Sequence, residues 1–166
     1  MAVQNPAPRF RVGADFEAAY PGASALATEC VLNMGFVCHR FTAYVEGLAR
    51  RHGIPSVAAF NVLTILGGAE QPLPPSVVAE RMVVTRGTIT SVVDSLECRG
   101  LVRRLPHGKD RRVRLIDITP EGSARAARVE VVLHGAEKRL LDRLTQAQQR
   151  QLLRMLAALQ ASLPTD

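Results

Sequence analysis

Residues 75–118 read PSVVAERMVVTRGTITSVVDSLECRGLVRRLPHGKDRRVRLIDI, and this stretch decides the fold. Its first part predicts a short helix over 75–82, with Val78 and Met82 on one face. A second helix follows, with the hydroxyl of Thr85 placed to serve as its N-cap. The apolar residues of this second helix fall within about 100° of arc: Ile89, Val92, Val93 and Leu96. Two helices separated by so short a turn predict a helix-turn-helix.

A β-hairpin is predicted directly after the second helix. Gly100 marks the helix end, because glycine accepts the left-handed conformation that a C-terminal stop requires. Two strand candidates, 101–105 and 112–118, are joined by a turn that contains Pro106 and Gly108. A helix-turn-helix with such a hairpin predicts a winged lobe, in a fold that is mainly α with a small β wing.

The positive charge of the chain is concentrated in this hairpin. The 166 residues have a formal net charge of +6. Seven basic residues lie between Arg99 and Arg114, opposed there only by Asp110, so this segment alone has a net charge of +6. One basic focus in an otherwise balanced chain favours contact with a polyanion over a merely solvated surface. With two tyrosines, five phenylalanines and no tryptophan, the chain lacks the exposed rings that single-strand binding by stacking requires.

The outer face of the second helix is suited to the major groove of duplex DNA. With Ile89 at the centre of the buried arc, small and hydroxylated residues face outward and permit close approach to base edges and phosphates. The predicted recognition residues are Thr85, Arg86, Gly87, Thr88, Thr90 and Ser91. Asp94 lies on the same face and would repel phosphates unless an arginine pairs with it, and the sequence names no partner for it.

The tip of the hairpin is the second predicted DNA contact. Its lysine and arginines can reach phosphates or a narrow minor groove, where the negative potential is deepest. The acid among them is interpreted as an internal brace that orients a guanidinium. The predicted wing residues are His107, Lys109, Asp110, Arg111 and Arg112.

Helical patterns flank the winged lobe on both sides. Apolar residues recur every three or four positions from residue 23 to about residue 50, which predicts a long amphipathic helix. Pro55 suits the first turn of the next helix, which ends at Gly67 and Gly68. Downstream of the hairpin, two helix starts are marked by a threonine: Thr119 before Pro120, and Thr145 with Gln148 as a capping box.

Residues 74–122 resemble the MarR family of multiple antibiotic resistance regulators. The matching elements, in order, are the stretch at 78–82, TxxxxT and VVDxL within 85–96, RGLVxR at 99–104, DxR at 110–112 and ITPEG at 118–122. The resemblance implies a homodimer in which the first, fifth and sixth helices of both subunits interleave. It also implies that Arg112 enters the minor groove and that Asp110 holds the wing in shape. Arg103 stands where the family often has an acid.

The prolines and glycines of residues 1–22 predict a flexible N-terminal arm. The resemblance sets the rest of the expected organisation: a dimerisation helix (23–54), a winged DNA-binding lobe (55–120) and C-terminal dimerisation helices (121–163). The expected function is that of a repressor released from DNA by a small aromatic or lipophilic effector. The cleft for the effector would lie between the helical base and the winged lobe and be lined from the first two helices and the fifth, with these candidate residues: Met34, His39, Phe41 and Phe60.

Two other interpretations remain open. The same fold could sense redox state through Cys30, Cys38 or Cys98, if one of them has an accessible thiolate. A winged lobe can also dock an acidic protein partner, although exposed aromatic residues would then be expected on the recognition helix.

The sequence favours no enzyme, cofactor or metal site. It has no phosphate-binding glycine loop and no nucleophile elbow. Its cysteines and histidines have no metal-ligand spacing. Residues 1–10 lack the apolar core of a signal peptide, and the longest uncharged run, 53–69, is interrupted by polar residues and proline. We therefore expect a cytoplasmic protein without a membrane partner.

Overall fold

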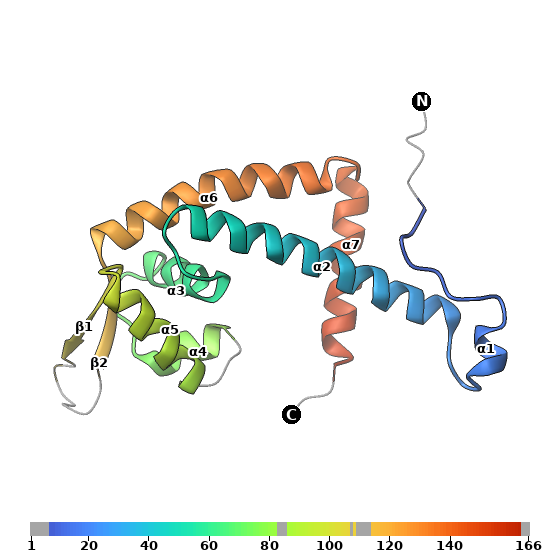
Figure 1. Cartoon of the computed structure of the whole chain (residues 1–166), viewed down its shortest axis with the longest axis horizontal. Helices are drawn as coiled ribbons and strands as arrows, with labels where there is room; N and C mark the ends of the chain where they lie inside the picture. The colour runs from blue at the N-terminus through green and yellow to red at the C-terminus, as the bar shows by residue number, and fades with distance from the viewer. Residues whose placement is uncertain (1–6, 83–85, 107, 109–113, 164–166) are drawn as a thin grey trace. The chain divides into compact units, whose positions relative to one another are not determined.

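The computed structural model describes residues 7–82, 86–106, 108 and 114–163. Most of the described chain is helical, with one small sheet, which confirms the predicted fold class (Figure 1). The elements are α1 (Phe16–Ala19), α2 (Ala25–Arg51), α3 (Val57–Gly67), α4 (Pro75–Met82), α5 (Arg86–Cys98), β1 (Val102–Pro106), β2 (Arg114–Ile118), α6 (Pro120–Leu141) and α7 (Gln146–Ala161). The chain divides into two compact units, one over Pro6–Glu130 and one that contains Val131–Asp166.

The helix starts follow from side-chain capping. Ser24 accepts a hydrogen bond from the Ala27 amide at the start of α2, and Ser56 accepts one from the Ala59 amide at the start of α3. The prediction that Pro55 lies in the first turn of α3 is therefore wrong by two residues, because Ser56 satisfies a free amide of that turn and so takes the N-cap. At the start of α7, Thr145 and Gln148 form the predicted capping box.

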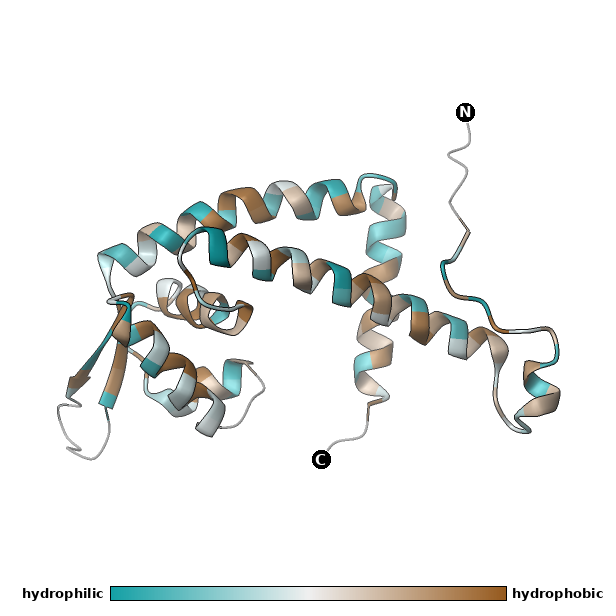
Figure 2. Cartoon of the chain, in the orientation of Figure 1, coloured by the Kyte–Doolittle hydropathy of each residue, from teal (hydrophilic) through white to brown (hydrophobic). Residues whose placement is uncertain are grey.

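Helix α3 is the centre of the core of the first unit. It packs against α2, α4, α5 and β2. Its residues are almost all apolar (Figure 2), and Phe60, Val62 and Leu63 are buried. From α5, Ile89 and Leu96 are fully buried against it, as the predicted apolar arc requires. This packing fixes the inner face of α5 and so determines which of its residues face outward.

The wing is an antiparallel pair of strands extended by one bridge. In the register of β1 and β2, Val102 lies opposite Ile118 and Arg104 opposite Ile116. Leu73, in the proline-rich linker before α4, exchanges two backbone hydrogen bonds with Ile116, at 2.7 and 3.0 Å. The linker is therefore extended at Leu73, and it holds the base of the wing against the lobe.

The segment before α2 contains more structure than a flexible arm. It includes the single turn α1 and makes hydrogen bonds to α2. The Phe10 amide donates to Asn33 Oδ1 (3.1 Å), the Asn33 amide group donates back to the Phe10 carbonyl (2.9 Å), and the Val12 amide donates to Glu29 Oε1 (3.0 Å). Polar side chains of α2 thus hold backbone that the proline and glycine content predicts to be loose.

The long helices present apolar residues that are not covered within a single chain. On α2, Val45 and Leu48 are buried, but Leu26, Val31 and Val37 of the same helix are exposed. No residue of α7 is buried, and Leu153 is 66% exposed. Apolar helix faces of this extent favour burial against another chain.

Candidate nucleic-acid interface

The outward face of α5 consists of small polar residues, as predicted. Gly87, Thr88, Thr90, Ser91 and Asp94 are all exposed, on the side opposite the buried arc. Of the remaining predicted residues, Arg86 begins α5, and Thr85 lies outside the described residues. No large side chain among the described residues of this face prevents the helix from entering a groove.

Asp94 has the arginine partner that the sequence did not name. Arg104 of β1 donates from Nη2 to Asp94 Oδ1 at 2.5 Å, and from Nη1 to a carboxylate oxygen of Glu97. The Arg104 amide also donates to Glu97 Oε1, at 3.1 Å. The hydrogen bond to Asp94, opposed by burial and reinforced by Glu97, raises the pKa of Arg104. One guanidinium therefore pairs with two carboxylates of the recognition helix, offsets part of their charge and ties that helix to the wing.

Two of the seven basic residues between Arg99 and Arg114 form ion pairs within the described chain and are therefore less available to a polyanion. Arg103 donates twice to Asp117 Oδ2 on the facing strand, at 2.6 and 2.9 Å. With Arg104 held by Asp94, two arginines of the segment are engaged with acids from outside it. Arg99 and Arg114 are exposed. The predicted wing residues His107, Lys109, Asp110, Arg111 and Arg112 lie outside the described residues, so their contacts remain a prediction.

Both ends of the wing are fixed at one point of the lobe. Gly100 has φ +70°, and the Leu101 amide donates to the Leu96 carbonyl at 3.0 Å, which closes α5 as predicted. The Thr119 hydroxyl donates to the Gly100 carbonyl (2.7 Å) and accepts from the Gly122 amide (3.0 Å). The end of α5 and the start of α6 are thus joined through one side chain, and the two strands leave from this junction.

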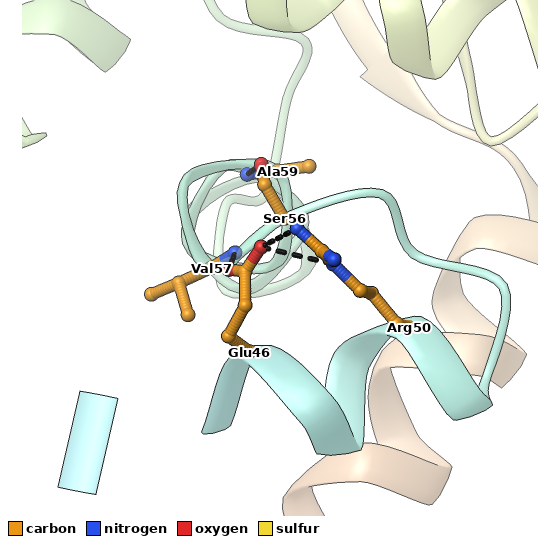
Figure 3. Close-up of polar contacts among 5 residues, drawn as sticks. All are labelled: Glu46, Arg50, Ser56, Val57 and Ala59. Atoms are coloured by element: carbon orange, nitrogen blue, oxygen red, sulfur yellow. Dashed lines mark hydrogen bonds and ion pairs between the residues drawn. The ribbon is translucent and has the colours of Figure 1, made fainter. Parts of the chain in front are cut away.

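Behind the lobe, a carboxylate of α2 supports the start of α3. Glu46 Oε2 accepts from the Val57 amide at 2.7 Å, and Glu46 Oε1 accepts from Arg50 Nη2 at 2.8 Å (Figure 3). Together with the Ser56 cap, this contact satisfies two of the free amides of α3. Glu46 therefore has a structural role in joining α2 to α3. Among the described residues, no group of three or more His, Cys, Asp or Glu side chains could hold a metal ion.

Three of the four predicted effector residues, Phe60, Phe41 and His39, do not gather at one place in the chain. Phe60 lies in the core of the first unit, and Phe41 stacks on Tyr44. His39 lines a shallow apolar hollow with Phe10, and it lies on the face of α2 opposite Phe41, because two helical positions differ by about 200°. Their role in effector binding stays a prediction.

The three cysteines are free and exposed in the chain. Cys30 and Cys38 therefore do not belong to the core of a single chain, and Cys98 lies at the C-terminal end of α5. Over the described residues, no helix is long and apolar enough to cross a membrane.

The fold and the exposed face of α5 define a winged helix-turn-helix protein. Residues 56–113 match the model of the MarR family. The HTH-type transcriptional repressor YetL of Bacillus subtilis is 29% identical over 119 residues, which is 71% of this chain and 71% of YetL. The chain is therefore similar to the MarR family of transcriptional regulators over residues 56–113.

Solved structures have the same fold. The MepR–DNA complex of Staphylococcus aureus superposes with a TM-score of 0.74 at 19% identity, covering 78% of this chain and 95% of MepR. CouR of Rhodococcus jostii RHA1, bound to p-coumaroyl-CoA, superposes with a TM-score of 0.70 at 22% identity, covering 87% of this chain and all of CouR. The chain thus shares its fold with these two proteins.

Proposed function

We propose that this chain is a sequence-specific transcriptional repressor that binds duplex DNA as a homodimer and releases it when a small effector binds. The observation that carries the proposal is the outer face of α5, where Gly87, Thr88, Thr90 and Ser91 are exposed. A helix with such a face fits the major groove, and its hydroxyls can hydrogen-bond to base edges and phosphates. The family match and the repressor YetL support the same function.

In this mechanism the wing supplies the charge and α5 supplies the specificity. Arg104 holds Asp94 and Glu97, which reduces the repulsion that two carboxylates would exert on phosphates beside the groove. Lys109, Arg111 and Arg112 are then the cations of the wing that contact the backbone or the minor groove. Counterion release at these contacts gives the salt dependence expected of duplex binding.

The homodimer follows from the uncovered apolar faces of the long helices. Leu26, Val31 and Val37 of α2, and Leu153 and Leu159 of α7, are exposed in the single chain. Burying them against a second copy gives a two-fold assembly with two winged lobes. Such an assembly requires a palindromic operator whose half-sites lie about one helical turn apart. We infer no catalytic step, since recognition and release account for regulation.

The experiment is a titration of the Arg112→Ala variant against an operator duplex, followed by fluorescence anisotropy. Loss of one phosphate or minor-groove contact should weaken binding about tenfold, while the unfolding midpoint stays unchanged. The matched control is Arg143→Ala, which removes the same charge between α6 and α7. Equal affinities for the two variants would contradict the role proposed for Arg112.

A further inference from the structure

A cavity of about 330 Å³ lies between α3 and the first part of α6. Its apolar walls include Leu63, Ile118 and Ala126, and its polar groups are those of Thr64, Ser123 and Glu130. This volume is at the lower end of the range found for small-molecule sites. None of the residues predicted from the sequence to line the effector site belongs to it.

The charge of the cavity is set by one carboxylate. Glu130 is the single charged residue among those that line it in the described chain, and it is partly buried. The Thr64 hydroxyl donates to Glu130 Oε1 at 3.3 Å, which directs the carboxylate toward α3. No lysine or arginine is among the described lining residues. An anionic ligand would therefore meet a like charge, whereas a cation would find a partner in a partly desolvated site.

We propose that this cavity binds a small amine, with an apolar body against Leu63 and Ala126 and an ammonium group paired with Glu130. The assignment rests on the proposed function, since it names the class of effector that would release DNA. The proposal predicts a cationic effector, whereas an aromatic acid would be anionic. The apolar walls contribute affinity, and the carboxylate selects the charge of the ligand.

The cavity lies where a ligand can influence the DNA-binding elements. Its α3 wall packs against both helices of the helix-turn-helix, α4 and α5. Its α6 wall begins next to the Thr119 junction from which the strands of the wing leave. A ligand between α3 and α6 therefore contacts the two elements that together set the position of α5 relative to the wing. If it binds one arrangement of these elements more tightly, it shifts the population toward that arrangement.

The test compares two probes that share a phenol ring and differ in charge, tyramine and 3-(4-hydroxyphenyl)propionate. Isothermal titration calorimetry of the full chain should show tyramine bound at least about fivefold more tightly, the scale of a partly exposed ion pair. In Glu130→Gln this preference should disappear, and in the control Glu137→Gln, on the exposed face of α6, it should persist. Ala127→Leu, which fills the cavity from an exposed helix position, should weaken the binding of tyramine.

Equal binding of the two probes, no binding of either, or an unchanged preference in Glu130→Gln would overturn the assignment. Duplex binding, measured on the same samples, separates this outcome from failure of the proposed function. A chain that binds the duplex but shows no charge preference retains the function and loses the cavity assignment. A chain that binds tyramine through Glu130 but binds no duplex retains the cavity and loses the function.

Discussion

Gly122, in the first turn of α6, lies so close to Leu101 that there is no room for a side chain. A Cβ built at this position would lie 2.0 Å from the carbonyl oxygen of Leu101 and 3.1 Å from the Ile118 side chain. The nearest group is backbone, which cannot rotate away as a flexible side chain can. The glycine thus permits the close contact between Leu101, the residue before β1, and the start of α6.

The Gly122→Ala variant tests this contact. Because the backbone at Leu101 must shift, we expect the free energy of unfolding to fall by about 2 kcal/mol, within the range for overpacked sites. The measurement is urea denaturation followed by circular dichroism. The matched control is Gly47→Ala in α2, where the added Cβ meets only the far end of Arg51 at 3.5 Å. That change should stabilise the chain by about 0.5 kcal/mol. Similar unfolding curves for the two variants would show that the close approach has no energetic consequence.

At this scale the sequence predicts local features well and distant partners poorly. The Thr119 cap, the left-handed Gly100 and the capping box of Thr145 involve residues at most a few positions apart, so the chain order alone indicates them. The partner of Asp94 is ten residues away and depends on how β1 crosses α5. A weak signal was present, because Asp94 and Glu97 share one face of α5 at a spacing of three residues.

At the scale of elements, the contact between α5 and β1 determines how the recognition helix and the wing approach DNA together. Arg104 joins them through both Asp94 and Glu97, and its side chain is only 28% exposed. By contrast, Arg103 of β1 pairs with Asp117 of β2, within the wing itself, and its side chain is 60% exposed. Only the first pair connects the two DNA-binding elements.

The Arg104→Met variant should weaken duplex binding about tenfold, since hydrogen bonds to charged groups contribute about 1.5 kcal/mol and two carboxylates would lose their partner beside the DNA. Arg103→Met removes the same charge but leaves α5 tied to β1, so its loss of affinity should be smaller. Anisotropy titrations of both variants at one salt concentration make the comparison. An equal loss in both would mean that net charge, and not the α5–β1 connection, sets the affinity.

Element boundaries show why some predictions from sequence fail. Pro55 and Ser56 are both ordinary signals for a helix start, and the sequence alone does not rank them. In the structure Ser56 caps α3 while Glu46, from the preceding helix, accepts from the Val57 amide. For a related reason the pattern identifies apolar positions such as Phe41 and Phe60, but not which of them the tertiary packing brings together.

At the scale of the whole molecule, a single chain leaves apolar helix faces exposed to water, and a second copy would cover them. Helix α7 has no buried residue, although its sequence has a clear apolar stripe at Leu152, Leu156 and Leu159. Capping by Thr145 stabilises the helix start, but it does not remove this stripe from water. The cost of leaving the stripe exposed favours dimerisation through the long helices.

The Leu156→Glu variant should therefore dissociate the dimer, because a carboxylate would have to be buried in an apolar interface without a partner. Sedimentation equilibrium measures the result as a shift toward the monomer mass. The control Ala158→Glu adds the same charge about 200° around α7, away from the stripe, and should leave the dimer intact. A dimer that survives Leu156→Glu would place the interface elsewhere.

The most direct test of the central claim, that the exposed face of α5 and the basic wing contact one duplex, is the salt dependence of binding to a palindromic operator duplex selected from DNA upstream of the gene. The logarithm of the association constant should fall linearly and steeply with the logarithm of the salt concentration, with a slope that reflects several neutralised phosphates on each half-site. Arg112→Ala should make that slope shallower by about one for each phosphate that is no longer neutralised. An affinity for this duplex that hardly changes with salt, or that equals the affinity for unrelated DNA, would contradict the account.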